Sequence, residues 1–170
     1  MRTVVVMVVM GALLLSAGAA FAQYGYGGST MPEEKPYLRA KVGWFEPSEG
    51  ALDGDLAFGV DYIVARGETQ LLYLTVDRLH AEDTTVENTA WSVLGGVYYK
   101  AKGGFYYGGG VGWSRNTLET VGLPDRDDDN LTWEVGASLG VGGKGFAEIK
   151  YRDGGQDGNT GVVLYVGTRY

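Results

Sequence analysis

The chain has 170 residues, a formal net charge of −7 and no cysteine. The acidic balance excludes the basic face that nucleic-acid binding needs. The absence of cysteine excludes a disulfide-stapled secreted domain and a lipid anchor attached through a cysteine. Stability must therefore come from buried surface or from closure of a sheet.

The first residues have the composition of a secretory signal peptide. Arg2 precedes an apolar run from Val4 to Leu15, and Ala20-Phe21-Ala22 supplies the small residues that a signal peptidase recognises before Gln23. The apolar run is shorter than the roughly 20 residues that a transmembrane helix needs. We therefore expect residues 1–22 to be a signal peptide and residues 23–36 to be a periplasmic leader.

From residue 37 onward, apolar residues alternate with polar or small ones, a pattern typical of β-strands. In 131–141, Leu131, Trp133 and Val135 share one face, and Thr132 and Glu134 share the other. No segment keeps the 3.6-residue period of a helix. Eight strands are predicted, at Tyr37–Phe45, Asp55–Ala65, Thr69–Leu79, Thr89–Tyr99, Phe105–Ser114, Leu131–Val141, Phe146–Arg152 and Thr160–Tyr170.

The connections between these strands alternate in length and charge. The first, third, fifth and seventh are long and mostly acidic, whereas the other three are short and contain Arg66, Lys100, Lys102 and Lys144 against Glu68. Short turns at one end and long loops at the other are typical of outer-membrane barrels. We therefore predict one all-β domain at residues 37–170, an eight-stranded antiparallel up-and-down transmembrane β-barrel in the bacterial outer membrane.

The tryptophans provide a separate indication of a membrane. Trp44, Trp91, Trp113 and Trp133 all fall at the long-loop ends of their strands, in the phase that faces outward. Tyr170 and other aromatic residues fall near the opposite ends. Because aromatic rings with a polar tip prefer the lipid headgroup level, we expect these residues to form two membrane-interface girdles.

The opposite phase places charged residues inside the barrel. These are Arg39, Lys41, Asp61, Glu134, Glu148, Lys150 and Arg169, and the same phase admits Asp77 and Arg152. Isolated charges in so narrow a space would be costly, so we expect them to pair across the lumen. Such a lumen is either a plugged structural core or a narrow ion path gated by paired charges.

Three segments carry a resemblance to a known group of proteins. They are Tyr37-Leu-Arg-Ala-Lys-Val-Gly-Trp-Phe-Glu-Pro47, Phe146-Ala-Glu-Ile-Lys-Tyr-Arg-Asp153, and the alternation of 160–170 that ends on Tyr170. Over the whole mature length, the chain resembles the eight-stranded outer-membrane β-barrel superfamily that includes the OmpA transmembrane domain and the OmpX and OmpW groups.

The resemblance implies that the terminal strand is the signal recognised by the barrel-assembly machinery. Tyr170 stands where Phe is commoner in that superfamily. We expect no peptidoglycan-binding domain after Tyr170, so the cell-wall tethering of full-length OmpA-like proteins is not implied. The other expected partner is outer-membrane lipid, and we expect a monomer.

Other motifs predict no enzyme and no cofactor. Gly140-Val-Gly-Gly-Lys-Gly145 matches a dinucleotide fingerprint by letters but joins two strands, so a turn is expected. His80 is the only histidine and has no serine motif beside it, which leaves little basis for a lipid esterase. Asp125, Asp127 and Asp129 are weak metal candidates because the EF-hand glycine and terminal glutamate are absent. Divalent cations shared with lipid phosphates are another possible role for the acidic loops.

Three functions are compatible with this architecture. The first is a structural or surface-interaction protein with acidic extracellular loops and a plugged polar lumen. The second is a narrow pore for ions or small apolar solutes. The third is a soluble periplasmic calyx, which predicts the reverse arrangement, with apolar residues inside and polar residues outside.

Overall fold

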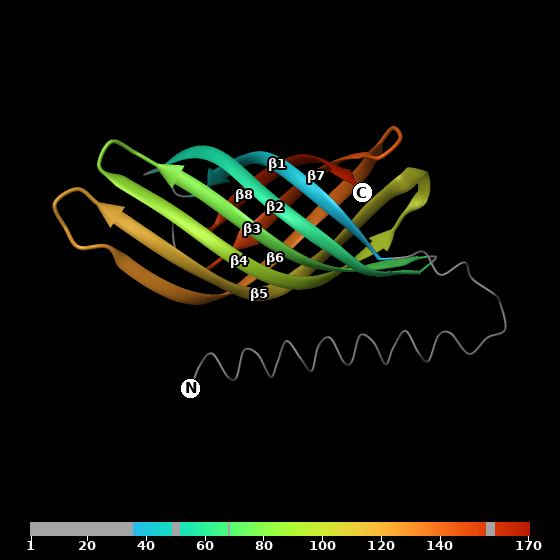
Figure 1. Cartoon of the computed structure of the whole chain (residues 1–170), viewed down its shortest axis with the longest axis horizontal. Coiled ribbons are helices and arrows are strands. Elements are labelled where there is room, and N and C mark those ends of the chain that lie inside the picture. Colours follow the sequence, from blue (N-terminus) through green and yellow to red (C-terminus); the bar gives the residue numbers. More distant parts are fainter. Residues whose placement is uncertain (1–35, 49–51, 68, 156–158) are drawn as a thin grey trace. The chain divides into compact units, whose positions relative to one another are not determined.

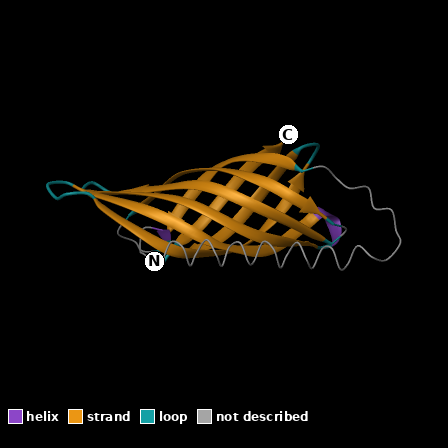
Figure 2. Ribbon diagram, turned by 60° about the horizontal axis from the view of Figure 1, so that its bottom comes forward, coloured by secondary structure: helices purple, strands orange, loops and turns teal. Residues whose placement is uncertain are grey.

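The computed structural model describes residues 36–48, 52–67, 69–155 and 159–170. These residues form a closed barrel of antiparallel strands that follow one another around the barrel in chain order (Figures 1 and 2). The strands are β1 (Tyr37–Pro47), β2 (Asp53–Arg66), β3 (Gln70–Glu82), β4 (Val86–Lys100), β5 (Phe105–Thr120), β6 (Arg126–Val141), β7 (Gly145–Asp153) and β8 (Gly161–Arg169), and η1 (Lys102–Gly104) is a short 3-10 helix. The predicted signal peptide and leader lie outside the described residues, apart from Pro36.

The predicted fold class is confirmed. Each strand pairs with its neighbours in the sequence, and the first and last strands close the barrel, with Val42 opposite Val166 in their register. Two ends of the barrel follow from this topology. We call the end with the β2–β3, β4–β5 and β6–β7 connections, where β1 begins and β8 ends, the turn end. The opposite end is the hairpin end.

Two predicted loops at the hairpin end are wrong in extent. Predicted loops at His80–Asn88 and Arg115–Asn130 shrink to Asp83–Thr85 and Val121–Asp125, because the strands continue as paired hairpins. These extensions are mostly polar, with Ala81, Val86 and Leu118 as exceptions, so they show no sustained apolar alternation. An antiparallel ladder satisfies its backbone hydrogen bonds without an apolar face, which explains why the sequence pattern missed the extensions.

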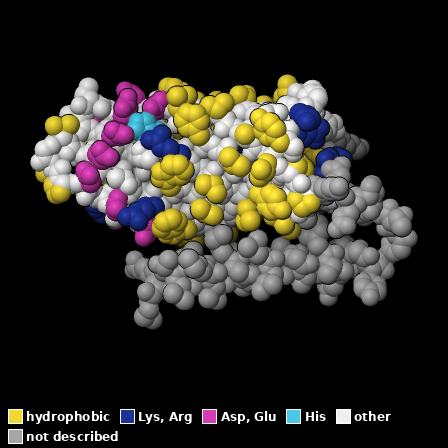
Figure 3. All heavy atoms as spheres, viewed as in Figure 1, with side chains coloured by type: hydrophobic (Ala, Val, Ile, Leu, Met, Phe, Trp, Pro, Cys, Tyr) yellow, Lys and Arg dark blue, Asp and Glu magenta, His cyan; other side chains and the backbone are white. Residues whose placement is uncertain are grey.

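Apolar side chains cover the outside of the barrel between the two ends (Figure 3). Outward-facing examples with 42–50% of their surface exposed are Val42, Phe58, Val60, Val76, Val135 and Ile149. The interior contains two separate apolar clusters. One, on the hairpin side, includes Phe45, Leu79, Val163 and Tyr165. The other, on the turn side, consists of Ile63, Leu71, Tyr73 and Tyr98.

No helix among the described residues is long and apolar enough to cross a membrane.

Candidate functional site in the barrel lumen

A group of buried charged side chains fills the middle of the barrel. We call it the lumen network, and it consists of Arg39, Lys41, Asp61, Asp77, Glu134, Glu148, Lys150 and Arg152. Five strands contribute these residues, and strand alternation places them all on inward positions. Cations and anions are equal in number, so the network is formally neutral.

The β1 cations bind the carboxylates of β2 and β3. Arg39 donates to Asp61 through both Nε, at 2.9 Å, and Nη2. Lys41 Nζ lies 2.6 Å from Asp61 Oδ1 and 3.0 Å from Asp77 Oδ1, and it also donates to Thr75 Oγ1 at 3.0 Å. Lys41 therefore links two neighbouring strands to β1 through a single ammonium group.

The β7 cations complete the network on the other side of the lumen. Arg152 Nη2 pairs with Asp77 Oδ2 and lies 2.7 Å from Glu134 Oε2, so it spans the barrel from β3 to β6. Lys150 Nζ lies 2.7 Å from Glu134 Oε1 and 3.5 Å from Glu148 Oε2. Glu148 returns to β1, with Oε1 3.3 Å from Arg39 Nη2.

Uncharged side chains also donate or accept hydrogen bonds within the lumen network. The sequence analysis does not assign these residues to the network. Tyr73 donates to Glu134 Oε1 and Tyr98 donates to Glu148 Oε1, each at 2.9 Å. Farther toward the hairpin end, Ser92 accepts from Arg152 at 3.2 Å. Ser114, Thr132 and Asn159 are also buried there. Strand alternation indicates that Tyr73, Tyr98 and Ser92 face inward. Their partners lie on strands far away in the sequence, so no local sequence pattern predicts these hydrogen bonds.

The arrangement compensates for the burial of these charges. Removing charges from water costs several kcal/mol per ion unless excellent geometry and extra hydrogen bonds compensate. Here each carboxylate contacts at least two cations. Phe45 and Tyr165 are almost fully buried on the hairpin side of the network. Eight strands leave an interior just wide enough for side chains.

Arg169 lies apart from the lumen network, although the sequence analysis grouped it with the other inward charges. Its Nη2 donates to the Gly143 carbonyl at 2.9 Å, and the residue is exposed at the turn end. Among the described residues, Arg169 forms no ion pair with a carboxylate. Gly140–Gly145 joins β6 to β7 as a tight turn, with Gly142 and Gly143 at φ of +55° and +47°.

The acidic residues of the β5–β6 hairpin do not form a metal centre in the described part of the chain. Asp127 accepts from Arg115 at 2.5 Å and from Thr117 at 2.8 Å. The Arg115 guanidinium holds the pKa of Asp127 below its ordinary value. Asp125 and Asp129 are exposed, and Asp129 lies in β6 opposite Arg115 in the register.

His80 lies among carboxylates on the outer surface near the hairpin end. Its ring nitrogens are 3.5 Å from Asp55, 3.7 Å from Glu82 and 3.7 Å from Glu87, and Nδ1 is 3.1 Å from Thr89 Oγ1. The hydroxyl group that these contacts bring to the ring is that of Thr89.

The aromatic residues expected to form membrane-interface girdles are exposed or partly exposed on the barrel surface. Trp44, Trp91 and Trp133 are 41–53% exposed, Trp113 is partly exposed, and Tyr170 is 74% exposed. Neighbouring rings pair on the outer surface, as Trp133 and Tyr151 do with centroids 5.8 Å apart. At the turn end, Tyr99 and Tyr107 do the same at 6.0 Å.

Comparison with known proteins places the fold in a class. No protein-family model and no curated protein matches the sequence. Among solved structures, the attachment invasion locus protein Ail of Yersinia pestis has a TM-score of 0.56 at 13% identity, over 79% of this chain and 97% of that one. The N-terminal β-barrel domain of Pseudomonas aeruginosa OprF has a TM-score of 0.57 at 11% identity, over 81% and 99%.

Neisserial surface protein A is similar at a TM-score of 0.51 and 14% identity, over 82% of this chain and 98% of that one. A second structure of Ail, in complex with the heparin analogue sucrose octasulfate, matches at a TM-score of 0.56. The chain therefore has the fold of the small eight-stranded outer-membrane barrels, without likeness to one member in particular.

Proposed function

We propose that this chain is an outer-membrane barrel with a structural or surface-interaction role, a lumen closed by ion pairs, and acidic hairpins displayed outside the cell. The observation that carries the proposal is the direction of the two faces. Between the two ends of the barrel, large apolar side chains are exposed on the outer surface (Figure 3). The eight charged side chains of the lumen network are buried inside. A soluble calyx requires the opposite arrangement, because water would then contact the outer surface.

The absence of native cysteine allows a direct test of this direction. Single-cysteine variants at Leu164, which faces outward, and at Tyr165, which faces inward, are spin-labelled in lipid vesicles. We expect the Leu164 label to be accessible to oxygen dissolved in lipid and the Tyr165 label to be shielded from it. Equal accessibility, or recovery of the protein with soluble periplasmic proteins, would overturn the membrane assignment.

The surface role is supported by carboxylates that stand in register at the hairpin end. Asp53, Glu82, Glu87 and Glu119 are direct neighbours across β2 to β5. Like charges at paired positions destabilise a sheet, so a row of this kind needs a reason other than folding. An acidic surface favours cationic partners by electrostatic complementarity.

Because of this charge pattern, we expect the chain to differ from Ail in its binding of polyanions. Ail was crystallised with a heparin analogue, whereas an acidic hairpin end would repel a polysulfate. We therefore expect the purified barrel to pass through immobilised heparin at low salt and to be retained by immobilised polylysine. Retention on heparin would contradict the proposed polarity of the outer surface.

The second candidate, a narrow pore, is supported by the unbroken polar connection from Arg39 to Arg152 through the barrel. In planar bilayers, the native chain is expected to be nearly silent because its charges are paired. Lys41→Met removes a cation that contacts Asp61 and Asp77, so conductance should rise in this variant if the network is a gate. Silence in both native and Lys41→Met channels would reject the pore.

A further inference from the structure

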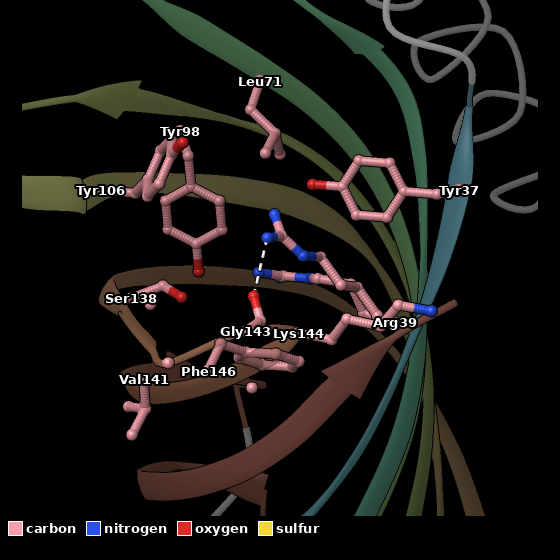
Figure 4. Close-up of a pocket in the computed structure, with 14 residues that line it drawn as sticks. Tyr37, Arg39, Leu71, Tyr98, Tyr106, Ser138, Val141, Gly143, Lys144 and Phe146 are labelled. Atoms are coloured by element: carbon pink, nitrogen blue, oxygen red, sulfur yellow. Dashed lines mark hydrogen bonds between the residues drawn. The ribbon is translucent and has the colours of Figure 1, made fainter.

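A cavity of about 270 Å³ opens at the turn end of the barrel. We call it the turn-end cavity. It is bounded by Arg39 of the lumen network, by the β6–β7 turn, and by the aromatic side chains of Tyr37, Tyr106 and Phe146. Figure 4 shows Tyr37, Tyr98 and Arg39 directed into the same space. Small-molecule sites typically occupy about 300–1,000 Å³, so an occupant of this cavity would be small.

The lining of this cavity is positively charged. Arg39, Lys144 and Arg169 line it, and no carboxylate belongs to its described lining. Arg39 and Arg169 are direct partners in the β1–β8 register, an arrangement of like charges that destabilises a sheet. The positive charge of Arg39 is balanced by the carboxylates of the lumen network. The positive charge of Arg169 is not balanced in this way, because its hydrogen bond goes to the uncharged backbone carbonyl of Gly143.

The two guanidinium groups differ in their surroundings, and both leave donors for a ligand. Arg39 uses Nε and Nη2 for Asp61 and Glu148, so its Nη1 is not part of those contacts. The Arg39 guanidinium also lies over the Phe146 ring, 4.4 Å from the ring centre. Arg169 is held at one nitrogen by Gly143. Planar guanidinium groups recognise carboxylate and phosphate through paired hydrogen bonds.

The remaining walls combine aromatic faces with hydroxyl groups. Tyr37 and Tyr106 pack beside the turn-side apolar cluster, and the Tyr106 hydroxyl accepts from Arg66 at 3.3 Å. Leu71 and Val141 add apolar surface, and Ser138 adds a hydroxyl. A flat apolar body therefore has rings to pack against, while an attached anion has cations within the same cavity.

We propose that the turn-end cavity binds a small organic oxyanion, with its carboxylate or phosphate group between Arg39 and Arg169 and its apolar body against Tyr37, Tyr106 and Phe146. The bound anion neutralises the opposed arginines at the β1–β8 closure. It therefore also stabilises the pairing of the first and last strands at this end. This site is independent of the role of the acidic hairpins and of any conductance.

The test is a titration of the full exported chain in a neutral detergent at low salt. Benzoate and phenyl phosphate are the probes, and uncharged benzamide controls for partition into the micelle. Binding is followed by the NMR shifts of the Gly142, Gly143 and Gly145 amides. We expect saturable shifts with both anions, none with benzamide, and an affinity that falls as salt is added.

Variants at the turn end separate this site from general electrostatic attraction. Arg169→Gln should lower the affinity for both anions about tenfold, since a charge-assisted hydrogen bond contributes roughly 1.5–3 kcal/mol. Arg169→Lys should give an intermediate affinity because it keeps the charge but loses the planar fork. Lys100→Gln is the matched control, because Lys100 is exposed at the same end and does not line the cavity. The affinity of the Lys100→Gln variant for both anions should equal that of the native chain.

Arg169→Gln lies outside the lumen network, so it should fold and keep the heat-modifiable gel migration of the native barrel. Equal binding of benzamide, or equal loss in Arg169→Gln and Lys100→Gln, would overturn the site. Tight binding of inorganic phosphate would overturn the role of the aromatic walls. Saturation that appears only after deletion of residues 23–35 would show that this segment, and not a small molecule, is the occupant.

Discussion

The lumen network and the hairpin end use the same charged residue types in opposite surroundings. In the lumen, Glu134 is buried and contacts two cations and a tyrosine hydroxyl. At the hairpin end, Glu82, Glu87 and Glu119 are direct neighbours across strands, and water screens their repulsion. The charged groups are therefore paired and buried in one region and exposed to water in the other.

This contrast predicts that losing one charge matters greatly in the lumen and little at the hairpin end. Arg152→Met leaves Asp77 and Glu134 with one fewer cation in a buried setting. The free energy of unfolding should fall by about 3–5 kcal/mol. Urea unfolding in lipid vesicles, followed by tryptophan fluorescence, measures this change.

The double variant Arg152→Met with Glu134→Gln restores the equality of cations and anions in the network. It should therefore be more stable than the sum of the two single variants predicts, which a double-mutant cycle detects. The exposed control Arg115→Met should leave global unfolding nearly unchanged. Additive losses would show that the pairs act independently and that overall balance is unimportant.

The outer surface gives the next largest expected effect. Val60 faces outward near the middle of β2. It lies two positions from Tyr62, toward the turn end, and four from Leu56, which pairs with Trp44 toward the hairpin end. An arginine near the middle of a lipid-facing surface costs about 2–4 kcal/mol. Val60→Arg should lower the free energy of unfolding in vesicles by that amount. Val121→Arg, at an 81% exposed hairpin position, should change it by less than about 0.5 kcal/mol.

Close packing beside the lumen network gives a smaller effect. A Cβ at Gly59 would lie 2.1 Å from Asp77 Oδ1 and 2.4 Å from Lys41 Cε, so an alanine there displaces an ion pair. Gly59→Ala should cost about 1–3 kcal/mol of unfolding free energy. Gly140→Ala is the matched control, since its Cβ would meet nothing within 4 Å. Equal effects in the two variants would show that crowding beside the network is unimportant.

The same contrast explains what sequence reasoning could predict. Alternation along 131–141 predicts the inward phase of Glu134, because one face of this segment is apolar and the other is polar or small. The β6–β7 hairpin register also places Arg152 directly opposite Glu134. The sequence does not give the contact with Tyr73, because Tyr73 approaches Glu134 from β3, across the closed barrel. The sequence pattern also does not predict the full length of the β5–β6 hairpin. The outer part of this hairpin is mostly polar, so no apolar alternation distinguishes one face from the other.

The turn-end cavity marks another limit of sequence reasoning. Arg39 and Arg169 are 130 positions apart in the chain, and only barrel closure places them opposite each other. Their shared inward phase suggested a common network. The register instead leaves Arg169 at the rim beside Gly143, where its charge is not balanced by the lumen carboxylates.

The smallest effect concerns acid titration at the hairpin end. Hydrogen bonds from Arg115 and Thr117 lower the pKa of Asp127, and backbone donors from Thr85 and Val86 lower that of Asp83. A carboxyl with a lowered folded-state pKa stabilises its hairpin above the unfolded pKa, and this contribution is lost as pH falls through the folded value. Both carboxyls are exposed, so we expect local changes only.

NMR titration of the carboxyl carbons measures these two values separately. The pKa of Asp127 should lie below about 3.9, the ordinary aspartate value, and should rise toward it in Arg115→Met. The pKa of Asp83 should not move in that variant, because its donors are the Thr85 and Val86 amides of its own turn. A shift of both residues would show that a general field of the hairpin end, and not the individual hydrogen bonds, sets the pKa.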